Sequence, residues 1–247
     1  MSLVAAGEPS VVRALGSLTR THRRHPEWPV LVLAAAGWVL LLSGHLPAAD
    51  HHGRAAAPTQ AAYADWCVMV LAMMVPTVVP AVRRVAFDSL RRRRLRAMGV
   101  FLAGYLALWG AFGVVTIALI GALDAVLPQS VGRALVPVAL LLAAAGYELT
   151  ARKRRFLRAC HLPAALPPTG WRADAACVRF GARQGRACLG SCGLLMLAMT
   201  AAGHGALLLV VLVSAIVAAR TLLVVGTKLG RPAAAALLVA SLILVTA

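Results

Sequence analysis

Long apolar segments separated by short basic segments make up most of the chain. A window of about 17 to 25 apolar residues is long enough to cross the hydrocarbon core of a bilayer as a helix. Backbone polar groups in lipid must be bonded within the protein, so helices are the economical structure for such windows. The pattern therefore predicts an all-α, polytopic membrane helix bundle of six or seven transmembrane helices. The expected helices lie at 29–46, 61–82, 98–122, 132–150, 187–202, 206–226 and 233–247, of which the fifth and the last are short.

The basic residues between these windows predict the orientation of the bundle. The segments 1–28, 83–96 and 151–186 hold most of the 25 Lys and Arg residues, whereas the loops on the opposite side hold Arg54 and Arg133. An excess of Lys and Arg in short loops marks the cytoplasmic side. We therefore expect a cytoplasmic basic tail at 1–28, a four-span half at 29–150, a cytoplasmic linker at 151–186 and a C-terminal membrane half at 187–247. Pro163, Pro167, Pro168 and Gly170 should interrupt any helix in the linker.

Composition and charge narrow the function classes. Hydrophobic residues make up 61% of the chain and charged residues 13%, which is far too apolar for a soluble domain. The net charge of +17 does not indicate nucleic-acid binding, because the basic residues lie in loops without a stripe of stacking aromatic residues. Neither a Gly-rich phosphate loop nor a Ser/His/Asp arrangement is recognisable, and no paired carboxylates stand out. We therefore expect no catalytic activity.

The most informative segment of the chain carries sulfur in a helical pattern. Cys188, Cys192, Met196 and Met199 fall on one face of a helix. Thiols and thioethers suit Cu(I), with zinc a secondary candidate. A seam of small residues, with methionine filling gaps against the next helix, explains the same spacing equally well. Both interpretations stay open on spacing alone.

Two further segments offer metal donors. The window 61–82 carries Cys67, Met69, Met73 and Met74, and its Pro76 and Pro80 should kink the helix and free carbonyl groups inside the bundle. These sulfurs could face the Cys/Met ladder, which is the row of Cys188, Cys192, Met196 and Met199, or they could simply fill the core. The first outer loop carries His45, His51 and His52, whose imidazoles suit Cu(II), Ni(II) or Zn(II), although a solvated polar loop is the simpler interpretation. Beside Cys67, the rings of Tyr63 and Trp66 fit an interfacial aromatic belt.

An ordered set of motifs runs through the chain from about residue 61 to residue 228. Its members are Trp66, 72–76, Pro80, 104–105, Trp109, 146–150, 160–163, Gly181, Gly185, 188–192 and Met196. This order resembles the bacterial family of predicted metal-binding integral membrane proteins, some of which are described as copper chaperones for tyrosinase-type oxidases. The family usually has two adjacent cysteines where this chain has Ser191 and Cys192. The resemblance implies copper handling in a bacterial membrane.

These observations together predict a copper-binding chaperone or relay in the bacterial cytoplasmic (inner) membrane, with its N-terminus inside. It would hold copper as Cu(I) on the Cys/Met ladder, and the outer histidines would receive or release the metal. Its partners would be membrane lipid and a copper-dependent oxidase or another acceptor protein. The alternatives are a transporter of metal or a small solute, and a non-catalytic structural subunit of a membrane complex.

Overall fold

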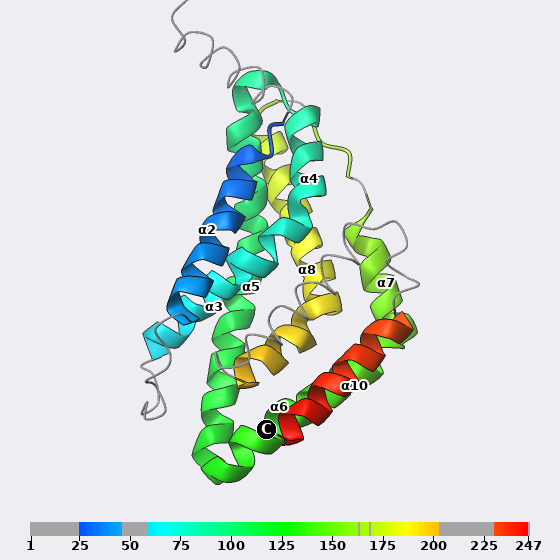
Figure 1. Cartoon of the computed structure of the whole chain (residues 1–247). Coiled ribbons are helices and arrows are strands. Elements are labelled where there is room, and N and C mark those ends of the chain that lie inside the picture. The colour runs from blue at the N-terminus through cyan, green and yellow to red at the C-terminus, as the bar shows by residue number, and fades with distance from the viewer. Residues whose placement is uncertain (1–24, 46–58, 163, 168, 203–229, 247) are drawn as a thin grey trace, which may run out of the picture.

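The computed structural model describes residues 25–45, 59–162, 164–167, 169–202 and 230–246. Every regular element within these residues is a helix, which confirms the all-α prediction (Figure 1). The elements are α2 (Trp28–His45), α3 (Thr59–Met73), α4 (Val75–Asp88), η2 (Arg91–Arg93), α5 (Arg94–Val126), α6 (Gln129–Glu148), α7 (Ala151–Cys160), α8 (Trp171–Ala202) and α10 (Gly230–Thr246).

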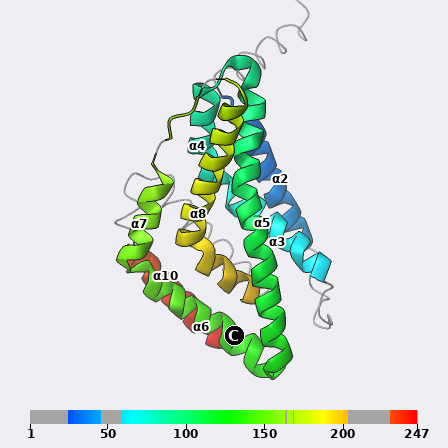
Figure 2. The same ribbon diagram turned by 180° about the vertical axis from the view of Figure 1, so that it is seen from behind.

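The two longest helices, α5 and α8, pack along each other and form the centre of the bundle (Figures 1 and 2). Glycine allows their backbones to approach closely. A Cβ atom added to Gly104 of α5 would collide with the carbonyl oxygen of Val178, and one added to Gly181 of α8 would collide with that of Phe101. Small residues at a helix interface permit this approach in membrane proteins. The contact therefore fixes the register between the two helices.

A broken helix covers one side of this central pair. α3 and α4 belong to one apolar segment, but their axes differ by 58° across a break at Met74. Pro76 lies in the first turn of α4 and Pro80 lies inside it, so two backbone N–H donors are missing from the helical ladder. The predicted proline kink is confirmed. α2 packs against both halves of the broken helix.

A second sharp turn separates α6 from α7. The axes of 135–148 and 151–160 differ by 77°, and Thr150 caps α7 by accepting a hydrogen bond from the Lys153 backbone N–H at 3.2 Å. Both helices pack against α8, and α10 lies along α6 (Figures 1 and 2). The turn therefore brings the short basic helix α7 back onto the sulfur-bearing helix.

The linker between α7 and α8 differs in part from the sequence prediction. The chain leaves the helix after Cys160, and the predicted interruption near the prolines is confirmed; Gly170 ends it with φ +81°. The sequence leads us to expect a helix that re-enters at 180–186 and continues into the window 187–202; α8 is continuous through both but begins earlier, at Trp171. Asp174 in its first turn accepts a hydrogen bond from Arg93 and forms an ion pair with Arg96 at 2.8 Å. These ion pairs tie the beginnings of α5 and α8 together.

The described part of the chain holds fewer candidate spans than the sequence predicts. Among the described residues, 91–126 and 171–202 are helices long and apolar enough to cross a membrane, and the two bent pairs raise the number to four if each is one span. α2 is a shorter apolar helix by the same criterion. The predicted window 206–226 lies outside the described residues.

Candidate metal centre

The sulfur-bearing residues of α8 lie on the face of the helix that is buried in the bundle. Cys188 and Cys192 are 4% and 5% exposed, and Met196 and Met199 are buried further along the helix. Residues four positions apart on a helix differ by only about 40° around its axis, which explains the common face. The structure therefore places all four side chains in the interior.

Met74 brings a sulfur of the second segment to this face. Its Sδ lies 3.8 Å from the Cys188 Sγ. Met74 is fully buried and stands at the break between α3 and α4. The proline-induced bend therefore positions a thioether against a thiol from a helix far away in the sequence.

Two hydroxyl groups lie beside the Cys188 thiol. The Tyr105 Oη of α5 is 3.2 Å from the Cys188 Sγ and 3.1 Å from the Met74 carbonyl oxygen. The Thr77 Oγ1 donates to that carbonyl at 2.7 Å and lies 4.0 Å from the same sulfur. A hydroxyl donor at this distance stabilises negative charge on the sulfur.

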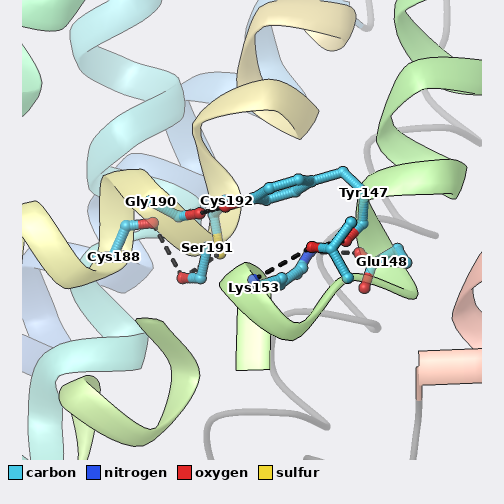
Figure 3. Close-up of polar contacts among 8 residues, drawn as sticks. Tyr147, Glu148, Lys153, Cys188, Gly190, Ser191 and Cys192 are labelled. Carbon is cyan, nitrogen blue, oxygen red and sulfur yellow. Dashed lines mark hydrogen bonds and ion pairs between the residues drawn. The ribbon is translucent and has the colours of Figure 1, made fainter. Parts of the chain in front are cut away.

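Ser191 connects the two cysteines of α8. Its Oγ donates to the Cys188 carbonyl oxygen at 3.0 Å and lies 3.4 Å from the Cys192 Sγ (Figure 3). The Cys188 and Cys192 side chains are also close enough to interact with each other. The family that this chain resembles usually has an additional thiol at position 191. Here that position holds the Ser191 hydroxyl, which is hydrogen-bonded to the backbone.

A buried ion pair lies on the Cys192 side of the cluster. The Lys153 Nζ donates to the Glu148 Oε1, and neither side chain is more than 2% exposed (Figure 3). Tyr147 donates its hydroxyl hydrogen to the Gly190 carbonyl at 2.6 Å, and its ring centre lies 5.8 Å from the Lys153 Nζ. The Lys153 ammonium is close enough to Cys192 to interact electrostatically with its sulfur. Lys153 favours negative charge on the Cys192 sulfur and Glu148 opposes it, so the paired charges largely cancel toward the cluster.

The other predicted ligands are placed differently. Met73 is buried in the core, and Cys67 and Met69 are half-buried against it. The sulfur of this segment that the structure places against an α8 thiol is that of Met74. His45 is the last residue of α2, while His51 and His52 lie outside the described residues. The outer histidine cluster therefore stays a prediction.

Two residues of this region are placed differently from what the sequence predicts. Lys153 belongs to the basic segment 151–186, yet it is 2% exposed and paired with Glu148. The signal was present, because a carboxylate at the end of an apolar window needs a partner. Trp66, expected in an interfacial belt, is instead buried and donates its Nε1–H to the Trp109 carbonyl at 3.0 Å. The interfacial interpretation was wrong because its ring packs against Trp109 and Phe112 of α5.

The donor set determines which metals the cluster suits. Among the described residues, no group of three or more His, Cys, Asp or Glu side chains is arranged to hold a metal ion. The cluster instead combines two thiols with a thioether, which are soft donors that suit Cu(I) better than a hard cation. Fold and site together define an apolar helical bundle with a buried centre of soft sulfur donors.

The chain belongs to the PpoB2 family of copper chaperones, whose family model matches residues 63–244. The matched region begins in α3 and ends in the last turn of α10. No curated protein and no solved structure matches the chain. Family membership agrees with the copper-chaperone part of the sequence resemblance. It makes copper the expected cargo. It also favours a non-catalytic role, with a copper enzyme as the recipient.

Proposed function

We propose that this chain is a membrane-embedded copper chaperone that holds Cu(I) between Cys188, Cys192 and Met74 and passes it to a copper enzyme. The observation that supports this best is the 3.8 Å approach of the Met74 Sδ to the Cys188 Sγ, with Cys192 one helical turn further along. Two thiolates from α8 and a thioether from the break between α3 and α4 form a low-coordinate site of soft donors. Such a site exchanges ligands more readily than a closed four-coordinate structural site.

The remaining sulfurs and imidazoles extend the proposed site into a relay. Met196 and Met199 continue the buried face of α8, and Cys67, Met69 and Met73 lie on α3, the first half of the broken helix. His45, His51 and His52 would act as transient ligands at the outer end, since neutral imidazole binds copper and is released on protonation. Copper would thereby move between sulfur and nitrogen donors.

The proposed location is the bacterial cytoplasmic (inner) membrane, with the N-terminus inside and six or seven spans. Support comes from the apolar helices α5 and α8 and from the two bent pairs. α2, α10 and the apolar window 206–226 would supply the remaining spans. Lipid would cover the many large apolar side chains exposed on α2 and α5, including Val39, Leu40, Val114 and Val115.

A copper transporter is the second candidate. Transporters use broken helices and buried charged groups near their binding sites. The break at Met74 and the buried Glu148–Lys153 pair are features of this kind. Vesicles containing the purified protein distinguish the two functions: a chaperone binds Cu(I) without moving it into the vesicle, whereas a transporter accumulates copper inside.

The sulfur site is tested by replacing both thiols of α8 with hydroxyls. We expect purified wild-type protein to bind Cu(I), and we expect Cys188→Ser with Cys192→Ser to lose most of that binding. The substitutions keep the side chains small, so the helix should still pack. Copper content per protein, measured after chelator competition, gives the answer.

Cys177→Ser provides a matched control, because Cys177 is also a buried thiol of α8 but lies three turns before Cys188. This variant should bind copper as the wild type does. Unchanged copper content in the double variant would overturn the proposed site and leave the cysteines as packing residues.

A further inference from the structure

A third thiol lies at the edge of the copper site. Cys160 is the last residue of α7 and shares a helix face with Lys153 and Leu157, because these residues are spaced by four and three positions. Both Lys153 and Leu157 are buried. The ring of Phe156, on the same side, lies against Gly190 of α8, between Cys188 and Cys192. The face of α7 that carries Cys160 is therefore the face that packs on the two-cysteine segment.

Hydrogen bonds from α8 fix the end of α7 above this segment. The Gln184 Nε2 donates to the Cys160 carbonyl oxygen at 2.7 Å, and the Arg183 Nη2 donates to the Leu162 carbonyl oxygen at 3.1 Å. Gln184 lies one helical turn before Cys188 and is itself buried. The backbone of Cys160 is therefore held within one side-chain length of the cysteine face of α8.

The side chain of Cys160 completes this placement. Its thiol is close enough to Ser191 for a hydrogen bond, and close enough to Cys192 and Cys188 for electrostatic interaction. Cys160 is half-buried, whereas Cys188 and Cys192 are almost fully buried. An incoming donor would therefore meet Cys160 before it met either of the other two thiols.

We propose that Cys160 is an exchange ligand, through which copper enters or leaves the Cys188, Cys192 and Met74 site. This proposal rests on the proposed function and assigns a role to a residue that lies outside the sulfur ladder. The three cysteines are not arranged as a ready three-ligand site among the described residues. Cys160 thus takes part during transfer and is not needed for storage.

The transfer step is a ligand exchange without oxidation or reduction. The Cys160 sulfur forms a bond to Cu(I) as the bond between copper and the Cys188 sulfur breaks, while Cys192 stays bound. The thiolate is the metal ligand, so Cys160 loses its proton on binding. The released Cys188 thiolate takes up one proton, and copper stays Cu(I) throughout. Two thiolates bind the copper before and after the step, so the net charge of the buried complex does not change.

The test separates copper binding from copper exchange. Full-length wild type, Cys160→Ser and Cys177→Ser are loaded with Cu(I) in detergent, and equilibrium affinity and release rate to the Cu(I) chelator bathocuproine disulfonate are measured. We expect Cys160→Ser to keep its copper content and affinity but to release copper roughly 10- to 100-fold more slowly, the scale on which residues supporting a metal site act. Cys177→Ser should match the wild type in both measurements.

Each outcome is decisive for one proposal. An unchanged release rate in Cys160→Ser would overturn the exchange role, as would loss of copper from the folded variant, which would make Cys160 a storage ligand. Wild type that binds no copper would overturn the proposed function itself. If Cys160→Ser fails to fold, alkylation of the copper-loaded wild type decides: protein modified at Cys160 by N-ethylmaleimide should keep its copper but release it to the chelator more slowly, and an unchanged release rate would overturn the proposal.

Discussion

Met74 differs from the other methionines of its segment in its surroundings. Methionine usually fills irregular gaps in apolar cores, and the sequence alone allows this role for every methionine of 61–82. The break between α3 and α4 sets Met74 apart, because it places the Met74 Sδ 3.8 Å from the Cys188 Sγ. The Tyr105 hydroxyl lies beside both residues. Position in the fold therefore distinguishes one methionine from its neighbours.

Met74→Leu should weaken Cu(I) binding while it preserves the fold. The two side chains have similar volumes, and such exchanges in a core cost less than about 1.5 kcal/mol. Loss of the thioether should lower Cu(I) affinity by roughly 10-fold or more, as measured by chelator competition. Met98→Leu is the control, since Met98 is a buried methionine of α5. Equal affinities in both variants would remove Met74 from the site.

The buried Glu148–Lys153 pair makes a different prediction at the same scale. Removing one member of a buried ion pair leaves an uncompensated charge and costs about 3–5 kcal/mol, whereas replacing both can be nearly neutral. We therefore expect Glu148→Leu and Lys153→Met each to lower thermal stability strongly. The double variant should recover much of the loss. Additive losses in the double variant would show that the two charges do not stabilise each other.

At the scale of elements, the contact between α5 and α8 positions the site. Gly181 approaches the backbone of Phe101, and Cys188 lies two turns further along α8, beside Tyr105 on α5. The same close approach that packs the helices therefore sets the distance between Tyr105 and the thiol. Small residues at the contact permit this spacing, and larger ones would push the helices apart.

Gly181→Ala should disturb both stability and copper binding. Its Cβ would collide with the Phe101 carbonyl, a backbone atom that cannot rotate away, and overpacking of this kind costs about 1–3 kcal/mol. Gly99→Ala is the control, because a Cβ at Gly99 of α5 meets nothing within 4 Å. Thermal unfolding and Cu(I) affinity of both variants provide the measurements. A Gly181→Ala protein as stable as Gly99→Ala would contradict the role of this contact.

The distribution of charge governs the molecule as a whole. Basic residues cluster at 83–96 and 151–186, and several of them have specific partners in the structure, including Arg93 and Arg96 at Asp174. Ion pairs hold the ends of α5 and α8, while the overall Arg and Lys excess predicts the cytoplasmic side. The same residues thus contribute to packing and to the expected orientation.

Cysteine labelling in intact cells tests this orientation. Arg92→Cys and Arg155→Cys should resist an impermeant thiol reagent added outside, because both basic clusters are expected in the cytoplasm. Arg54→Cys, in the predicted outer loop, should react. Reaction of either cluster position before lysis would reverse the predicted orientation, and permeabilised cells show that each introduced thiol is reactive.

Apolar periodicity and proline placement predicted the all-α class, the kink at Pro76 and the common face of Cys188 and Cys192, because these follow from local geometry within one segment. The choice of Met74 over Met73, the burial of Lys153 and the approach of Cys160 depend on which helices meet and at what angle. Packing between segments far apart in the chain decides such contacts, and a two-residue turn such as that after Glu148 is enough to redirect a whole helix. The sequence therefore determined the soft sulfur chemistry, while the tertiary structure decided which sulfurs come together.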